Sequence, residues 1–296
     1  MDWHLLIMFL VNGIIVGTLY GVVAMCFVLI YKSTQIVNFA QGQFLLVGAW
    51  ICWATMVKFG LPFWVGFPIT LAFMFIFGVL LQVVVLRPMI GEPIISVIMM
   101  TIGLSIVLKA LMGWAFGVQV KPFPTIFETS SVDIFGLSVQ SAYLMSFVIS
   151  ILIMVGFFWF FKYSRMGLAM RATAFDQQVA QSLGISVRRV FALSWAISAM
   201  VSALAGVVIG IVNGVSSALA FYGIKVFPAV IIGGLDSIGG GVVGGLIVGV
   251  LENLGAFADN YLHWGSLYEV VPFYVLIIVL MIKPYGLFGT QDIERI

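Results

Sequence analysis

Apolar runs long enough to cross a lipid bilayer occupy most of this chain. A stretch of about 20 apolar residues matches the hydrocarbon thickness of a bilayer, and a helix satisfies its own backbone polar groups there. We therefore predict an all-α fold, a polytopic helical bundle in a membrane that forms a single domain over residues 1–296. The predicted spans lie near residues 5–30, 40–57, 61–86, 94–117, 141–161, 190–212, 240–258 and 268–283.

Composition supports this class. Hydrophobic residues make up 63% of the sequence and charged residues 8%, whereas a soluble domain carries about 25% charged residues. The net charge of +2 comes without a basic patch interleaved with aromatic residues, so we expect no nucleic-acid partner. Cys26 and Cys52 both lie in apolar runs, which favours a packing role over a disulfide or a metal site.

One further segment, residues 217–235, is apolar but short. It contains Pro228 and ends in Gly233-Gly234, and both residue types interrupt helices. We predict a broken or half-length helix here. The bundle then has eight or nine transmembrane segments, depending on whether this helix crosses the membrane or re-enters on the same side.

A polar island at residues 162–190 sets the predicted orientation. It holds five of the thirteen Lys and Arg residues, and basic residues near span ends are retained in the cytoplasm. With this loop inside, the N-terminus lies outside. If 217–235 crosses, the C-terminus is cytoplasmic with Lys283 and Arg295, and nine of the thirteen basic residues lie inside. The positive-inside rule favours that arrangement of nine crossings.

The same loop carries the pattern of a short amphipathic helix. Thr173 is a suitable N-cap, with Asp176 three residues later, and Gly184 suits a left-handed C-terminal position. Residues at spacing four form one apolar stripe on this helix: Phe175, Val179 and Leu183. Such a helix at the cytoplasmic surface either docks into a partner or lies on the lipid.

The entrance to the second predicted span is rich in amides: Gln35, Asn38, Gln41 and Gln43. On a helix, the first three share one face. Asn38 also suits an N-cap that Gln41 answers at the third helical position. Capping explains two of the four amides, whereas a polar face along a solute path explains all four, so both interpretations stay open. Thr101 in the fourth span is a weaker candidate for the same path.

Few ionisable residues lie within the predicted spans. Lys109 and Glu252 have matching estimated depths near outer span ends, so they either extend outward to water or form an ion pair inside the bundle. We expect no charged relay near the membrane midplane, where an ion-driven carrier keeps one. This pattern disfavours a stand-alone secondary carrier.

Catalytic signatures are missing from the sequence. It contains no HExxH, GxSxG or P-loop pattern, and its histidines, His4 and His263, lie near predicted outer span ends. We therefore expect a chain without catalytic residues, without a metal site and without a bound cofactor. Nucleotide chemistry, if any, belongs to a partner.

Glycines recur at spacing four in three series. They are Gly13, Gly17 and Gly21; Gly206, Gly210 and Gly214; and Gly241, Gly245 and Gly249. Small residues at this spacing let helix backbones approach closely in lipid. The contacts lie either within the bundle or at a subunit interface.

Several segments together carry a family resemblance. They are VNFAQGQF at 37–44, TIGLS at 101–105, YSRMGLAMRATAFDQQVAQSLGI at 163–185, KVFPAVIIGGLDSIGGGVVGGLIVGVLENL at 225–254 and KPYGLFG at 283–289. The chain resembles the inner-membrane permease subunits of branched-chain amino-acid ABC importers, in particular the first of the two homologous permeases. The resemblance covers essentially the whole chain. It departs at Gln41 and Gln43, where the family usually has a histidine and an acidic residue.

The resemblance implies a permease subunit of an ATP-driven importer, which moves branched-chain or related apolar amino acids across the bacterial inner membrane. The implied partners are a homologous second permease, two cytoplasmic ATPases that bind ATP and Mg, an extracytoplasmic solute-binding protein and membrane lipid. Residues 162–190 would be the coupling loop. Its residues for coupling to the ATPase would be Arg171, Thr173, Phe175, Asp176, Val179, Ala180, Leu183 and Gly184.

Two other functions stay open. An ABC permease for urea or short-chain amides is the runner-up, and a stand-alone secondary carrier is the second alternative. The sequence does not decide whether the permease pair is a heterodimer or a homodimer.

Overall fold

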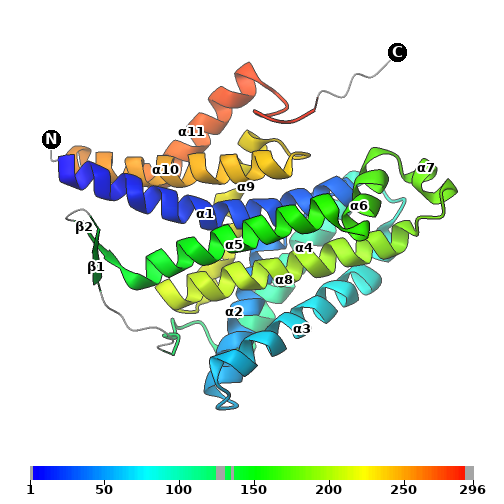
Figure 1. The fold of residues 1–296 in the computed structure, drawn as a ribbon, viewed down its shortest axis with the longest axis horizontal. Helices are drawn as coiled ribbons and strands as arrows, with labels where there is room; N and C mark the ends of the chain where they lie inside the picture. The colour runs from blue at the N-terminus through cyan, green and yellow to red at the C-terminus, as the bar shows by residue number, and fades with distance from the viewer. Residues whose placement is uncertain (1–2, 125–130, 135–136, 291–296) are drawn as a thin grey trace. The chain divides into compact units, whose positions relative to one another are not determined.

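The computed structural model describes residues 3–124, 131–134 and 137–290. Within these residues the regular secondary structure is helical apart from one antiparallel hairpin and an isolated bridge (Figure 1). The α-helices are α1 (Trp3–Thr34), α2 (Gln41–Val57), α3 (Phe63–Leu81), α4 (Ile94–Phe116), α5 (Ser141–Tyr163), α6 (Arg165–Phe175), α7 (Gln177–Ser182), α8 (Val187–Asn213), α9 (Phe221–Gly233), α10 (Ile238–Leu262) and α11 (Leu267–Ile282). The hairpin strands are β1 (Ser131–Ile134) and β2 (Leu137–Gln140).

The helices confirm a polytopic helical bundle. In the described part of the chain, six helices are long and apolar enough to cross a membrane. Three shorter apolar helices accompany them, at Gln41–Val57, Ser217–Gly233 and Leu267–Ile282. The number of crossings and the cytoplasmic C-terminus stay predictions, because length and composition alone do not show on which side of a membrane a helix ends. Arg295 lies outside the described residues.

The chain divides into two compact units. The first comprises Met1–Val28, Thr129–Ile151 and Lys225–Ile296, and the second comprises Leu29–Glu128 and Leu152–Ile224. Three helices, α1, α5 and α9, contribute residues to both units. A single domain over residues 1–296 stays a prediction.

Three helices, α2, α3 and α8, build the core of the second unit. α2 is buried along nearly its whole length. Phe44 of α2, Met74 of α3 and Trp195 of α8 are fully buried in one hydrophobic cluster, and the rings of Phe44 and Trp195 meet edge to face at 5.9 Å. This packing of helices through bulky side chains fixes the scaffold from which the coupling loop extends.

Glycines set the spacing of the core helices in the second unit. A Cβ on Gly206 would lie 2.2 Å from the carbonyl oxygen of Leu45, and one on Gly78 would lie 2.6 Å from the Cα of Ala196. These contacts lie within the unit, as expected for small residues that let backbones approach. Gly214 departs from its predicted series, because it follows the end of α8 with a φ of +79°.

The first unit is built around α1 and α10, which lie side by side (Figure 1). A Cβ on Gly17 would lie 2.8 Å from the Cα of Leu246, and one on Gly245 would lie 2.3 Å from the backbone nitrogen of Gly21. The first and third glycine series therefore pack against each other within the chain.

The predicted half-length helix near 217–235 is confirmed as a short 3-10 turn, Ser217–Ala220, followed by α9. Pro228 lies inside α9 and removes one backbone donor. The helix ends at Gly233, and Gly234 has a φ of +106°. Chain reversal at glycine therefore limits the length of this helix.

The residues after α11 fold back on the end of α9. The N–H of Leu287 donates to the carbonyl of Ile232 at 2.8 Å, and that of Phe288 donates to Gly233 at 3.1 Å. Gly286 has a φ of +80°, and a Cβ there would lie 2.5 Å from the carbonyl oxygen of Ile231. The KPYGLFG segment thus has a glycine where both conformation and space require one.

The β1–β2 hairpin was not predicted. Ser131 pairs with Gln140 and Ile134 with Leu137 in an antiparallel register. The sequences SVDI and LSVQ alternate polar and apolar residues, which is the period of a strand. The hairpin is a short exception in an otherwise helical fold, since each of its strands has only four residues.

Candidate functional site

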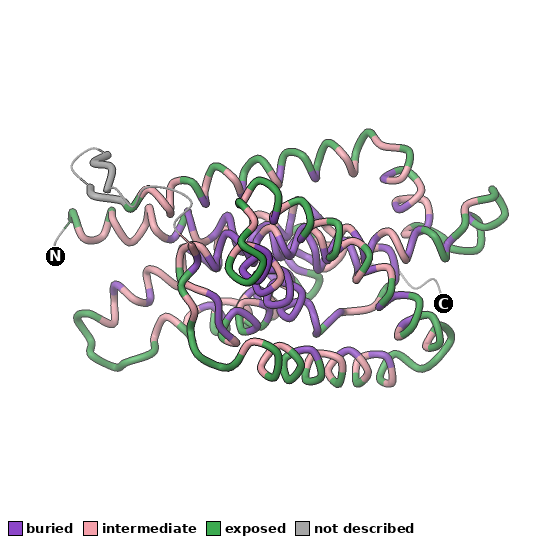
Figure 2. The backbone as a smooth tube through the Cα atoms, turned by 90° about the horizontal axis from the view of Figure 1, so that it is seen from below, coloured by how far each residue is buried: buried purple, intermediate pink, exposed green. Residues whose placement is uncertain are grey.

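The coupling loop is an ordered pair of helices, α6 and α7, that projects from the second unit at the far right of Figures 1 and 2. Ser164 caps α6, since its hydroxyl oxygen accepts from the N–H of Gly167 at 2.8 Å. A Cβ on Gly167 would lie 2.3 Å from the carbonyl oxygen of Phe161. Glycine at 167 therefore lets α6 turn back closely against the end of α5.

Arg171 ties α6 to the end of α5. Its guanidinium donates to the carbonyl of Phe161 and, at 3.2 Å, to that of Lys162. The last carbonyls of a helix have no partner within the helix, and a cation near them is favourable. Arg171 thus positions the loop through contacts within the chain.

The predicted helix boundaries were wrong at their start. Thr173 does not cap a helix: it lies inside α6, is buried, and its hydroxyl donates to the carbonyl of Ala169 at 2.9 Å. Asp176 is the cap of α7 instead, because its carboxylate accepts from the N–H of Gln178 at 2.7 Å and of Val179 at 2.9 Å. A charged acceptor at a helix start is stronger than a hydroxyl.

The predicted end of the helix is confirmed. Gly184 has a φ of +83°, and its N–H donates to the carbonyl of Gln181 at 2.9 Å. The N–H of Ile185 donates to the carbonyl of Ala180 at 3.0 Å. These two hydrogen bonds together form a Schellman motif, which favours glycine at its left-handed position. Ala180 is itself buried, and α7 packs against α8 at this point.

The three predicted apolar residues of the loop remain uncovered. Phe175 is 94% exposed, Val179 54% and Leu183 75%. They do not share one helix, since Phe175 ends α6 while Val179 belongs to α7 and Leu183 caps its C-terminus. We call these three residues the loop patch. Large apolar side chains that are exposed on a polar loop outside the apolar spans are candidates for an interaction site.

The amide-rich entrance is not helical, contrary to the shared face predicted for Gln35, Asn38 and Gln41. Gln35 has a φ of +58° and is exposed, and the chain is irregular from residue 35 until α2 begins at Gln41. Asn38 does not cap α2. Its side-chain oxygen accepts from the N–H of Ala40 at 3.0 Å, which forms a local turn.

A buried polar cluster surrounds Gln41. Its amide nitrogen donates to Ser198 at 3.1 Å and also to Ser202, while its oxygen accepts from Asn38 at 3.2 Å. Gln41 is completely buried between α2 and α8. Because buried amides need partners, these contacts fix the entrance segment to α8. Ser198 and Ser202 were missed, although their spacing of four places them on one face of a helix.

The remaining path candidates are also buried. Gln43 is 8% exposed and Thr101 is fully buried. The hydroxyl of Thr101 accepts from the N–H of Phe39 at 3.4 Å, so α4 also contacts the entrance segment. Of the predicted path residues, the structure brings Asn38 and Gln41 into direct contact and leaves Gln35 exposed. Their role in a solute path stays a prediction.

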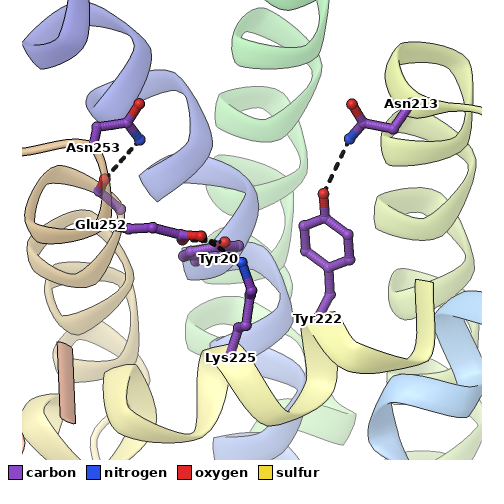
Figure 3. Close-up of polar contacts among 7 residues, drawn as sticks. Tyr20, Asn213, Tyr222, Lys225, Glu252 and Asn253 are labelled. Atoms are coloured by element: carbon purple, nitrogen blue, oxygen red, sulfur yellow. Dashed lines mark hydrogen bonds and ion pairs between the residues drawn. The ribbon is translucent and has the colours of Figure 1, made fainter. Parts of the chain in front are cut away.

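The first unit holds a charged cluster that the sequence did not predict. The ammonium of Lys225 in α9 donates to Glu252 Oε1 at 2.5 Å, and the Tyr20 hydroxyl donates to Glu252 Oε2 (Figure 3). Lys109, the predicted alternative partner, is exposed, with its ammonium 5.0 Å from the centre of the Phe221 ring.

The predicted depth of Glu252 was also wrong. α10 continues to Leu262, so Glu252 lies in the middle third of the helix and not near its end. The expectation that the spans lack a central charged group therefore fails, and it no longer counts against an ion-driven carrier. Lys225 was the available signal, since it is a lysine inside an otherwise apolar segment.

Metal-ligating side chains do not gather in the described part of the chain. No group of three or more His, Cys, Asp or Glu residues there is placed to hold a metal ion. Cys26 and Cys52 are both buried and take part in no disulfide among the described residues, consistent with the packing role expected for them.

Comparison with known proteins gives the family. A family model described as "Branched-chain amino acid transport system / permease component" matches residues 9–280. The chain belongs to this family. It is therefore a multi-pass membrane protein and a permease component of a transport system with several components.

Individual relatives align along almost their whole length. The high-affinity branched-chain amino acid transport system permease protein BraD of Pseudomonas aeruginosa is 31% identical, over 97% of each chain. LivH of Escherichia coli, with the same description, is 30% identical over 96% of each chain. The probable branched-chain amino acid transport permease protein LivH of Methanocaldococcus jannaschii is 28% identical, over 96% of this chain and 93% of that protein.

A solved structure shares the fold. It is described as "PsaBC from Streptococcus pneumoniae in complex with Fab" and has a TM-score of 0.55. The match covers 96% of this chain and 94% of that chain at 20% identity. At this identity the likeness concerns the fold alone.

Proposed function

We propose that this chain is the membrane-spanning permease subunit of an ATP-driven importer for branched-chain or related apolar amino acids. The family match over residues 9–280 carries the proposal, together with relatives of the same description that align over nearly their full length. Binding and translocation of solute would be this chain's task, and catalysis would belong to its partners.

The loop patch is the proposed contact with a cytoplasmic ATPase. Five residues form its frame by holding helix ends or packing inside the loop: Arg171, Thr173, Asp176, Ala180 and Gly184. Phe175, Val179 and Leu183 would then fill an apolar groove on the ATPase. Exposed cations of the same loop, Arg165, Arg188 and Arg189, would supply charge for this contact. A rigid frame is needed, because a loop that yields cannot transmit movement.

The amide-rich entrance is the proposed border of the solute path. Exposed Gln35 offers a neutral amide to a passing solute without fixing a charge. Burial of Asn38, Gln41, Gln43 and Thr101 favours a second role for them, in which they hold this border against α2, α4 and α8.

The complete importer would contain partners outside this chain. We propose a homologous second permease, two cytoplasmic ATPases carrying ATP and Mg, and an extracytoplasmic binding protein that selects the cargo. The chain would lie in the bacterial inner membrane with its N-terminus outside and its C-terminus in the cytoplasm, as the basic residues indicate.

Solute uptake by cells tests the function directly. A strain that lacks this gene should lose ATP-dependent uptake of labelled leucine, isoleucine or valine, and a plasmid copy should restore it. Loss of urea uptake with normal uptake of these amino acids would establish the amide importer instead.

A test of the secondary-carrier alternative uses the purified chain alone. Reconstituted alone in liposomes, the chain should move no labelled leucine when a proton or sodium gradient is applied. Uptake driven by such a gradient would establish a secondary carrier and refute an ATP-driven permease.

A further inference from the structure

The charged cluster of the first unit lies away from the coupling loop and the amide-rich entrance in the sequence. Both oxygens of Glu252 have a partner among the described residues: Lys225 at Oε1 and Tyr20 at Oε2. Figure 3 shows the three side chains pointing toward one another from α10, α9 and α1. Tyr20 and Glu252 both lie in the middle third of helices that are long and apolar enough to span a membrane.

An ion pair at such a depth is costly to keep. Taking two charges out of water costs several kcal/mol for each ion in a real protein, and apolar side chains of similar volume often pack as well or better. The helices of this unit do not need the ion pair in order to pack, because glycines bring α1 and α9 against α10. An ionisable residue retained inside a membrane span is therefore first a candidate for function.

The pair is accessible to a small polar ligand. The Lys225 side chain is 34% exposed and that of Glu252 is 14% exposed. The ammonium has three donors, and the contact to Glu252 uses one of them. The other two donors of the ammonium remain for an incoming anion.

The surroundings let the two charges separate. Tyr20 lies between Gly17 and Gly21, which pack directly on α10, so its hydroxyl stays aimed at Glu252. That hydrogen bond keeps the carboxylate partnered when Lys225 turns away. The Tyr268 ring centre lies 5.5 Å from the Lys225 ammonium and offers it a second favourable contact.

We propose that Lys225 and Glu252 receive the charged head group of an amino-acid solute. The carboxylate of the solute binds Lys225, and the ammonium of the solute binds Glu252. The zwitterion thus replaces the contact between the two residues. Both the pair and the zwitterion are neutral overall, and the exchange leaves no charge unpaired. This inference rests on the proposed function and narrows its cargo to zwitterions.

The exchange also suits a site on a translocation path, where a solute binds weakly and leaves again. The broken Lys225–Glu252 contact offsets part of what the solute gains, so the solute is held weakly and can leave. Urea or a short amide carries no net or zwitterionic charge, so it cannot replace the ion pair of Lys225 and Glu252 that it would separate. The cluster therefore favours amino acids over the runner-up cargo.

The test uses the whole importer, purified through a tag on this chain and reconstituted in proteoliposomes with ATP on the ATPase side. The variant Lys225→Met with Glu252→Gln removes both charges and keeps size and an acceptor for Tyr20. We expect its maximal rate of leucine uptake to fall by at least about tenfold. The amount of assembled complex and the ATP hydrolysis stimulated by the binding protein should stay near the wild-type level.

A neighbouring residue provides the control. Asn253 follows Glu252 on α10, and its amide donates to the carbonyl of Gly249 in the same helix at 3.0 Å. Asn253→Ala should leave leucine uptake within about twofold of the wild type. Uptake at the wild-type rate by the doubly neutral variant would show that the pair is structural and overturn the inference.

A second variant decides the case in which the doubly neutral complex does not assemble. Glu252→Asp keeps both charges but shortens the carboxylate's reach, so the complex should assemble and yet transport leucine more slowly. Wild-type uptake by that variant overturns the inference. If the wild-type importer itself carries urea and no amino acid, the proposed function and this inference fall together; leucine uptake that is insensitive to both variants removes the inference alone.

Discussion

Gly48 of α2 faces Ala203 of α8 so closely that a Cβ added to Gly48 would lie 2.4 Å from the Cβ of Ala203. Real side-chain atoms do not approach to this distance, so one helix would have to move. The neighbouring contact of Gly206 with Leu45 leaves little room for that movement. The α2–α8 spacing is therefore set by the absence of a single methyl group.

Gly48→Ala should destabilise the chain by about 1–3 kcal/mol, the usual cost of overpacking a well-packed interior. Thermal unfolding in detergent, followed by loss of monodisperse protein, measures this. Gly103→Ala is the matched control, because a Cβ on Gly103 meets nothing within 4 Å and alanine favours a helix. Equal melting temperatures for the two variants would contradict the close α2–α8 packing.

Gln41 gives a second prediction about the same pair of helices. Gln41→Asn shortens the amide, so that it cannot reach Ser198 and Ser202 while it bonds Asn38. Buried groups left without partners cost about 1–3 kcal/mol, and the melting temperature should fall. The same change at exposed Gln35 should shift stability by less than about 0.5 kcal/mol.

Uptake by these variants tests the solute path. If Gln41 acts through packing, leucine uptake per assembled complex stays near the wild-type rate while less complex assembles. A lower rate per complex without loss of stability would instead give Gln41 a direct place in the path.

Much of the fold was predictable because lipid imposes a simple rule on sequence. Helices that cross lipid must be apolar and internally bonded, so runs of apolar residues located the long helices within a few residues. Gly184 and Gly234 likewise marked the ends of short helices through backbone conformation alone. These features depend on residues close together in the chain.

Features that depend on distant residues were missed. Whether Thr173 or Asp176 caps α7 depends on where α6 ends, which is set by its packing on α8 and its contact with α5. Gln41 was interpreted as part of a helix cap or of a solute path, because its hydrogen bond to Ser198 of α8 joins residues far apart in the sequence. Lys225 and Glu252 are 27 positions apart, and nothing in local periodicity pairs them.

Orientation in the membrane gives a third prediction. In a background without Cys26 and Cys52, Gln178→Cys should react with a membrane-impermeant thiol reagent only after the cells are opened. Phe59→Cys, at a position 74% exposed between α2 and α3, should react in intact cells. Both expectations follow from the basic residues of the 162–190 loop. Labelling of Gln178→Cys from outside would refute the proposed orientation.

Phe175→Asp should uncouple the importer without unfolding this chain. Phe175 is 94% exposed, so a carboxylate there stays in water when the chain is alone. In an apolar groove of a partner, the same carboxylate would lose its water at a cost of about 1–3 kcal/mol or more. Uptake of leucine should fall, and the ATPases should co-purify less well with the tagged chain, while the melting temperature of the chain itself is unchanged.

Gln181→Asp is the matched control, because it adds the same charge to the same loop, on α7, at an exposed position outside the loop patch. Leucine uptake and ATPase recovery should stay close to the wild type in this variant, since no apolar contact is lost. A polar or lipid-bound loop would make the two variants behave alike. Wild-type uptake by Phe175→Asp would therefore mean that the loop patch does not couple this chain to the ATPase. Another cytoplasmic surface would then have to make that contact.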